Sequence, residues 1–521
     1  MKTVDLTIRE QKLRYAKPWL AIAYFSIPTV LIMLIQGFYN IIDKELALQF
    51  AALDLRQDPW YIQQYNLITK HNVTSIPLKD MQAFINVATQ YTTQIYSLLW
   101  SFSLITGMGC AINFSLAYGR RDLLQMREIA GNGFSCTILF SIVSSLLMFC
   151  LIFPPWHAVF ITSQMGGMYN NITNHLAWEY SYPMLLTTPL MFLSYYFVSL
   201  LRNEGRTNYV LLLITVSVFV NMGAGIFFMK VCHLKMEGAM LGTVVAWLWQ
   251  IIVGFIIVFC SKSSYSQFKW QDVVKIKWSN ITAFFKAGLS NFISNFALVV
   301  SSYLSTVLVV LLPNQEQYNG VSVLQELLSA LNPWITLILS AGIGLTQGAR
   351  TVIVYNYGAQ KYHRIWQVLK ITSYLLIIWF CLMLLLVIIF NREMMLMFAF
   401  PIQYVEKYKW WLVLCVCSYP FCATTFICFT LYQGINKTTL ASVTTSFRAI
   451  FIAIPMICLG YGVSIWFNNS IYYFIFMGAI DFVSSLCLIP FLCYSWKKYH
   501  LQLIDHPDNF IPNVLKIKVQ K

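Results

Sequence analysis

Long apolar stretches separated by short polar segments run along almost the whole chain. A helix needs about 20 mostly apolar residues to cross the hydrocarbon core of a bilayer, and twelve stretches reach that length. Each is expected to be helical, because a helix satisfies its own backbone hydrogen bonds where no water is present. The predicted spans are residues 18–43, 83–117, 129–153, 177–201, 209–230, 239–261, 284–312, 321–349, 366–390, 408–432, 441–465 and 470–494.

The composition agrees with a membrane protein. Of 521 residues, 58% are hydrophobic and 11% are charged, whereas a typical soluble domain is about 25% charged. A multidomain soluble enzyme, a disordered scaffold and a disulfide-rich secreted domain are therefore excluded. Twelve of the 13 cysteines lie inside apolar stretches, where free cysteine packs as a small hydrophobic side chain. Neither a disulfide framework nor a metal site is predicted from them.

The positive charge lies in short clusters between the apolar stretches. The formal net charge is +15, but no sustained basic run with interleaved aromatic residues occurs, so no nucleic-acid partner is expected. With the N-terminus inside, the inner connections and both tails carry 26 of the 35 Lys and Arg residues. Cytoplasmic loops collect Lys and Arg. Both termini are therefore predicted to be cytoplasmic, in a multi-pass protein of the plasma membrane.

Similar motifs follow corresponding spans in the two halves of the chain. Tyr118-Gly119 follows the second span and Tyr357-Gly358 follows the eighth. The predicted fold is an all-α polytopic membrane protein, with twelve transmembrane helices in two six-helix parallel repeats and the substrate path between them. The expected parts are a tail (1–17), a first lobe (18–261) with an external insertion at about 44–80, a cytoplasmic linker (262–283), a second lobe (284–496) and a tail (497–521).

Few ionisable side chains fall inside the predicted spans, and such residues are functional candidates by default. Asp43 is the leading candidate, because Gln36 and Asn40 precede it by seven and three residues and share its helix face. Pro28 lies 15 residues before Asp43 and is expected to kink or loosen the helix. The alternative interpretation is that Asp43, beside Lys44, only marks the outer end of the helix.

The second half offers two further acids. Glu326, beside Gln325, begins the eighth span, either as a cavity-lining acid that binds a proton or a cationic substrate, or as a group that reaches external water. Asp481 and Arg448 differ in depth by roughly 10 Å at 1.5 Å of rise per residue. A long Arg side chain bridges that difference, so the two are predicted to form a buried structural ion pair.

The order and spacing of these motifs resemble the multidrug and toxic compound extrusion (MATE) transporters. The resemblance implies a cation-coupled exporter of two six-helix lobes that moves amphipathic and often cationic compounds outward. It implies no enzymatic activity and no cofactor; the partners are a small amphipathic substrate and the lipid bilayer, and a monomer is expected. The similar segments are Ile27 to Asp43, Leu201 to Arg206, Gly238 to Thr243, Gly342 to Lys361 and Gln433 to Lys437, with Asn221, Arg448, Pro455 and Asp481.

The chain departs from this family's pattern at the coupling site. Many relatives carry an Asp four residues after the Asn of the fifth span. In this chain the Asn is Asn221, and the residue four positions later is Gly225. Thr243, in the sixth span, lies across the lobe. Some relatives carry an acid in the seventh span, where this chain has Asn295. The coupling ion, H⁺ or a Na⁺ bound near Asp43, is left open.

The alternative function is a flippase or exporter of a lipid-linked sugar or polysaccharide precursor on the same superfamily fold. Such a protein needs a more basic cavity for the diphosphate of its substrate, whereas the Lys and Arg residues of this chain crowd the predicted inner ends of the spans. Antiport of amphipathic drugs or toxic metabolites is therefore the first expectation.

Overall fold

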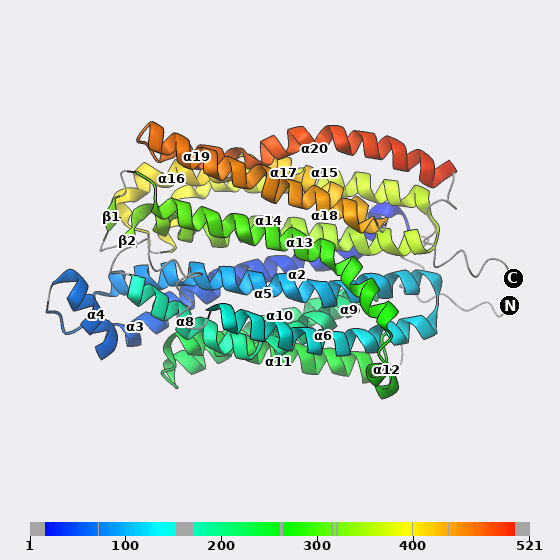
Figure 1. Ribbon diagram of the computed structural model, residues 1–521, viewed down its shortest axis with the longest axis horizontal. Helices are drawn as coiled ribbons and strands as arrows, with labels where there is room; N and C mark the ends of the chain where they lie inside the picture. Colours follow the sequence, from blue (N-terminus) through cyan, green and yellow to red (C-terminus); the bar gives the residue numbers. More distant parts are fainter. Residues whose placement is uncertain are drawn as a thin grey trace.

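A computed structural model describes residues 16–70, 72–152, 170–260, 264–313, 316–318, 321–398, 400–435 and 437–505. Long helices run side by side along one axis in two groups, which we call the first and second lobes (Figure 1). The first lobe contains α2 (Pro18–Leu46), α5 (Leu78–Arg120), α6 (Leu123–Ile152), α8 (Asn170–Leu186), α9 (Thr188–Asn203), α10 (Thr207–Lys230) and α11 (Lys235–Cys260).

The second lobe repeats this arrangement. Before it comes the short α12 (Trp270–Val274), which packs on α6. The lobe contains α13 (Trp278–Val310), α14 (Val323–Gly358), α15 (Tyr362–Leu396), α16 (Ile402–Val416), α17 (Tyr419–Gly434), α18 (Thr438–Ser446), the π-helix η2 (Phe447–Ala453), α19 (Ile454–Trp466) and α20 (Ile471–Asp505). Between α13 and α14, β1 (Gln317–Tyr318) pairs antiparallel with β2 (Val321–Ser322), with Gln317 opposite Ser322.

Two ends of the bundle can be distinguished (Figure 1). At the termini end, α2 begins and α20 ends. At the opposite, hairpin end lies the insertion after α2. Among the described residues, eleven helices are long and apolar enough to cross a membrane, and α8 with α9, bent by 62°, makes a twelfth span. The predicted fold class is confirmed.

The break in the fourth span recurs at the corresponding place in the second lobe. A proline stands in the first turn of α9 and again in the first turn of α17. Proline lacks the N–H that a continuous helix needs but fits a first helical turn, so each span is divided there. The repeat is therefore visible in helix interruptions as well as in loop motifs.

The lobes meet along two antiparallel helix pairs, α2 with α14 and α5 with α13. A Cβ atom added at Gly288 of α13 would lie 2.0 Å from the carbonyl oxygen of Ile105 in α5. One added at Gly348 of α14 would lie 2.4 Å from the Cα atom of Ser26 in α2. Glycine at these positions is what lets the helix backbones touch across the interface.

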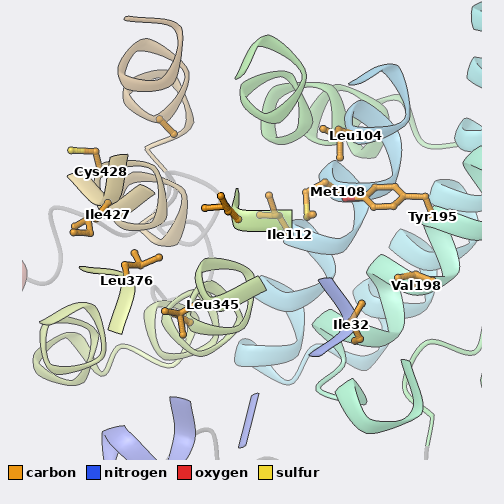
Figure 2. Close-up of a cluster of buried hydrophobic side chains, with 14 of the residues drawn as sticks. Ile32, Leu104, Met108, Ile112, Tyr195, Val198, Leu345, Leu376, Ile427 and Cys428 are labelled. Atoms are coloured by element: carbon orange, nitrogen blue, oxygen red, sulfur yellow. The ribbon is translucent and has the colours of Figure 1, made fainter. Parts of the chain in front are cut away.

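One apolar core joins the two lobes. It includes Ile32 and Met108 from the first lobe and Leu345 and Cys428 from the second, each at most 8% exposed (Figure 2). Exposed apolar side chains such as Leu139 and Ile378 lie on the outside of the bundle, where a bilayer rather than water is the matching solvent. The core therefore holds the lobes together while the outer surface faces lipid.

The insertion at the hairpin end is helical and is fixed to the first lobe. It contains the π-helix η1 (Ala47–Ala51), α3 (Ala52–Leu55) and α4 (Pro59–Thr69). Asp58 accepts a hydrogen bond from the backbone N–H of Trp60 at 2.8 Å, which caps α4, and forms an ion pair with Lys235. The hydroxyl of Tyr61 lies 2.9 Å from Nδ1 of His175 in α8. The insertion thus covers one end of the first lobe.

Lys235→Ala is expected to loosen this insertion at neutral pH and to have little effect at pH 3. Partial burial opposes ionisation of Asp58, but hydrogen bonds from Lys235 and Trp60 outweigh it and hold the pKa of Asp58 below its ordinary value. A lowered pKa stabilises the fold above the unfolded pKa of about 3.9, and this contribution is lost as pH falls through the folded value. The pair is partly exposed, so its contribution is about 1 kcal/mol or less.

Deuterium uptake of residues 59–69, corrected for intrinsic exchange, measures this effect. Lys79→Ala is the control, because Lys79 is an exposed residue at the same end. Equal loosening by Lys79→Ala, or a Lys235→Ala effect of the same size at both pH values, would contradict the assignment.

Candidate functional site

The hairpin-end half of α2 lies between the lobes and presents consecutive ionisable residues to opposite sides. Asp43 lies against α8 and α10–α11 of the first lobe through its contacts with Tyr180 and Tyr39. Lys44 reaches the second lobe, where its Nζ donates a 2.8 Å hydrogen bond to the carbonyl oxygen of Ser329 in α14. Successive helix residues point about 100° apart. One turn of α2 therefore contacts both halves of the molecule.

Asp43 is the centre of a hydroxyl network. Its carboxylate is close enough to the hydroxyls of Tyr39 and Tyr180 to interact with both. The Tyr39 hydroxyl lies 3.1 Å from Oγ1 of Thr243, and Nδ2 of Asn221 donates to both Tyr39 and Thr243. Because the Tyr39 oxygen accepts from Asn221, its own proton is available to Asp43. The network connects α2, α8, α10 and α11.

Helices α10 and α11 pack closely beside Asn221. A Cβ atom at Gly242 of α11 would lie 2.8 Å from Cα of Gly225 in α10 and 2.9 Å from Oδ1 of Asn221. The two helices approach closely at this point, and they hold Asn221 and Thr243 next to each other. Asn221 is 3% exposed, and its Oδ1 has no hydrogen-bond partner among the described residues. The site is thus one carboxylate surrounded by neutral polar groups.

The structure brings Asp43, Asn221 and Thr243 together but leaves the other two α2 candidates outside. Asn40 is exposed and Gln36 is half-buried, and neither side chain bonds to a described residue. The reason is that α10 and α11 approach α2 on the side of Tyr39, so Tyr39 takes the place expected for them. Pro28 is buried inside an uninterrupted α2, in the segment whose Ser26 contacts Gly348 of α14.

A second cluster closes the lobe interface at the hairpin end. Glu326 of α14 is 2% exposed, so it does not reach external water in this structure. Lys44 attracts it electrostatically across the interface and also lies 5.0 Å from the centre of the Phe398 ring. Nε2 of Gln325 donates a 2.7 Å hydrogen bond to the hydroxyl of Tyr91 in α5. Both candidates of the eighth span therefore bind the first lobe.

The remaining candidates lie elsewhere in the second lobe. Asn295 donates a 3.1 Å hydrogen bond to the backbone oxygen of Asn291 in its own helix and touches neither cluster. Arg448 in η2 and Asp481 in α20 form a two-point ion pair at 2.5 and 3.0 Å. Asp481 is 2% exposed. A fully satisfied buried pair of this kind fixes two helices relative to each other.

Lys44→Met is expected to destabilise the purified protein by about 1–2 kcal/mol, because it removes the hydrogen bond to Ser329 and the attraction to Glu326. The double change Lys44→Met with Glu326→Gln is expected to recover part of this loss. Unfolding of the detergent-solubilised protein measures both. Strictly additive effects of the two changes would show that the residues do not interact.

Two tyrosines and one lysine of these clusters escaped the sequence reasoning. Tyr39 lies four residues before Asp43, so it shares its helix face, but tyrosine is common in membrane helices and carried no distinct signal. Tyr180 lies in a different span, and no local pattern links it to Asp43. Lys44 looked like an end-of-helix cation, and only the tertiary structure shows that it lies between the lobes.

Comparison with known proteins places this geometry in context. The family described as MatE matches residues 87–227 and 291–459, more than half of the chain. The uncharacterized protein MG447 of Mycoplasma genitalium is 22% identical over 484 residues, which cover 87% of this chain and 86% of that protein. A homolog of it from Mycoplasmoides gallisepticum is 21% identical over 388 residues, and this match spans 65% of each chain, just under two thirds of that relative.

Solved structures share the fold at low sequence identity. A MOP superfamily transporter from Pyrococcus furiosus is 13% identical, with a TM-score of 0.75 over 96% of this chain and 99% of that one. A MATE protein in complex with MaL6 is 14% identical, with a TM-score of 0.72 over 93% and 98%. An outward-facing multidrug resistance MATE family transporter is 13% identical, with a TM-score of 0.72 over 94% and 98%.

Proposed function

Since the chain belongs to the MatE family, we propose that it is a proton-coupled exporter of amphipathic small molecules. It is a multi-pass membrane transporter and not an enzyme. In the proposal, the lobes alternate between a state open at the termini end and a state open at the hairpin end, and protonation of Asp43 biases that equilibrium. The termini end is taken as cytoplasmic, as the distribution of Lys and Arg predicts.

The observation that carries the proposal is the hydroxyl network of Asp43. An ionised carboxylate only accepts hydrogen bonds, whereas a protonated one also donates. Protonation therefore turns one acceptor of the site into a donor, which changes the interactions of Asp43 with Tyr39 and Tyr180. Because Tyr39 is bonded to Asn221 and Thr243, the change reaches α10 and α11.

A proton fits this site better than Na⁺ does. Hard cations bind more tightly as the number of charged oxygen ligands rises, and the network holds a single carboxylate. The groups around the carboxylate are hydroxyls and an amide, which add no negative charge to hold a metal cation. These features favour H⁺ as the coupling ion.

Helix α2 contacts both lobes, and this supports coupling between Asp43 and the movement of the lobes. Asp43 belongs to the first-lobe network, and the adjacent Lys44 bonds to Ser329 of the second lobe. A shift of α2 that follows protonation would therefore strengthen or break the hydrogen bond between Lys44 and Ser329. That contact closes the hairpin end, so its release would open the exit side.

Transport into everted membrane vesicles tests the proposal. Either a pH gradient or a Na⁺ gradient is imposed across the vesicle membrane. Uptake is measured with ethidium as a cationic probe and carboxyfluorescein as an anionic one. The pH gradient is expected to drive uptake of at least one probe, and the Na⁺ gradient none. Uptake driven only by Na⁺, or by neither gradient, would contradict proton coupling.

The alternative substrate, a lipid-linked sugar or polysaccharide precursor, is kept for one specific reason. Two buried arginines, Arg202 and Arg350, lie between the lobes, and buried cations favour an anionic ligand.

A further inference from the structure

Two arginines are buried together in the termini-end half of the lobe interface. Arg202 lies one residue before the end of α9 and is 2% exposed. Arg350 lies in α14, eight residues before its end, and is 6% exposed. Each guanidinium is close enough to the other, and to the ring of Tyr195, to interact electrostatically. The pair therefore places two positive charges in one buried layer.

The hydrogen-bond partners of both guanidiniums are neutral. Arg202 donates to the side-chain oxygen of Gln347, and Arg350 donates to that of Gln433. A second nitrogen of Arg350 lies 3.2 Å from the sulfur of Met108. Nε of Arg202 has no partner, and neither arginine meets a carboxylate, among the residues that the structure describes.

Two other arginines among the described residues, one buried and one partly buried, are treated differently. Arg206 is paired with Glu204 at 3.0 Å, and Arg448 with Asp481 at 2.5 Å. Glu204 also accepts hydrogen bonds from the backbone of Tyr265 at 2.9 Å and from the hydroxyl of Ser266. Where an arginine has a purely structural role here, a carboxylate offsets its charge. Arg202 and Arg350 lack that compensation, and burying an uncompensated charge is costly.

The layer lies across the surface at which the lobes must separate. Arg202 belongs to the first lobe and its partner Gln347 to the second, while Arg350 of the second lobe contacts Met108 of α5 in the first. Gln433 continues the layer by donating a 3.0 Å hydrogen bond to the hydroxyl of Ser290 in α13. Opening of the termini end breaks the two contacts between lobes and turns both guanidiniums toward the opening.

We propose that Arg202 and Arg350 bind the phosphate group of the transported molecule. This inference rests on the proposed function and deepens it, since it names the substrate class as an amphipathic phosphate ester or diphosphate. Guanidinium groups match phosphate oxygens in a two-point geometry that amides cannot supply. A bound phosphate provides the negative charge that the layer lacks, so the lobes close over a neutralised site.

Aromatic rings connect this subsite to Asp43. The rings of Tyr195 and Trp100 lie 4.5 Å apart between centres, and those of Trp100 and Tyr96 lie 6.2 Å apart and nearly parallel. Tyr96 interacts electrostatically with Asp43. An amphipathic substrate whose phosphate binds the arginines would lie along these rings, with its other end toward the coupling carboxylate.

The test is isothermal titration of the purified full-length protein in a nonionic detergent. The probes are pyrophosphate for a soluble source of the phosphate group, dioctanoyl phosphatidate for a lipid source, and dioctanoylglycerol as the neutral control. Binding of pyrophosphate, of phosphatidate or of both supports the proposal and identifies the source, provided that Arg350→Gln and Arg202→Gln each weaken it about tenfold or more. Arg350→Lys keeps the positive charge but loses the two-point geometry of the guanidinium, so it is expected to bind the probes with intermediate affinity.

The control is Arg392→Gln, because the Arg392 side chain is 57% exposed at the hairpin end. Its affinity for the probes is expected to equal that of the unchanged protein. Arg350→Gln is expected to unfold at the same temperature as the unchanged protein or higher, because it removes a buried charge that has no counter-charge. Failure of both anions to bind, equal binding by all variants, or a weakened Arg392→Gln would overturn the proposal. No ion gradient is applied, so this result is independent of the test for proton coupling.

Discussion

Asp43→Asn is expected to abolish gradient-driven transport while leaving the protein folded in the membrane. The amide is close in shape to the carboxylate and keeps one acceptor oxygen, so the hydroxyls of Tyr39 and Tyr180 still have a partner. The amide does not titrate, so the two protonation states that bias the lobes are lost. Probe uptake into everted vesicles, normalised to the amount of protein, measures the effect.

The matched control for this change is Asp54→Asn. Asp54 lies in the insertion, where its carboxylate is 2.9 Å from Nδ1 of His233 and is partly exposed. Its replacement removes an acid at the same end of the molecule and is expected to leave transport unchanged. Retained transport in Asp43→Asn, or equal losses in both variants, would remove Asp43 from the coupling mechanism.

Gly288→Val is expected to abolish transport by a different route, through the interface between α5 and α13. Even a Cβ atom at this position would lie 2.0 Å from the carbonyl oxygen of Ile105, so α5 and α13 must move apart. The lobes then cannot close at the termini end, and the cycle stops in a state open on that side. Faster deuterium uptake in residues 278–290 and in residues 104–118 is the expected signature.

Gly223→Val provides the control for the added volume. No heavy atom lies within 4 Å of a Cβ atom at Gly223, so this variant is expected to transport and exchange like the unchanged protein. If Gly288→Val transports normally, the contact between α5 and α13 is not part of the working cycle.

The sequence predicted the fold because length and hydropathy determine which segments can cross a bilayer. Each of the twelve predicted spans corresponds to one helix or to consecutive helices of the structure. Residues 153 and 261 lie outside the described residues, and Val321 and Ser322 form β2. The helices often run past the predicted ends. For example, α14 continues to Gly358 although the predicted span ended at residue 349. Hydropathy detects the apolar part of a helix and misses the polar turns at its ends.

That limitation explains why the arginine layer was missed. The fourth predicted span ended at residue 201 and the eighth at residue 349, immediately before Arg202 and Arg350. A charged residue ends an apolar window, so both arginines were assigned to the inner face of the membrane. The structure instead buries them among helices, so the interior of this chain is more basic than its sequence indicated.

The candidate site was only partly predictable for a similar reason. Asp43 was identified because an acid inside an apolar stretch is rare. Its partners Tyr39 and Tyr180 depend on which helices approach α2, which no local pattern specifies. The same holds for Glu326. Its sequence position allowed either a buried or a water-exposed group, and only its burial at the lobe interface decides the question.

The consequence for mechanism is that α2 is shared by the two lobes. Asp43 and Lys44 are adjacent in sequence but bind opposite halves of the molecule. Protonation of Asp43 and the contact of Lys44 with the second lobe are then linked through one turn of α2. In the proposed cycle, the phosphate of the substrate binds the arginine layer at one end, and the proton acts at the other.

The most direct test of coupling at Asp43 is the release of protons when substrate binds. Purified protein in weakly buffered detergent solution is mixed with a transported probe, and a pH indicator records the change. Because binding and protonation are reciprocally linked, the unchanged protein is expected to release up to about one proton per molecule and Asp43→Asn none. Equal release by both proteins, or no release by the unchanged protein, would contradict proton coupling through Asp43.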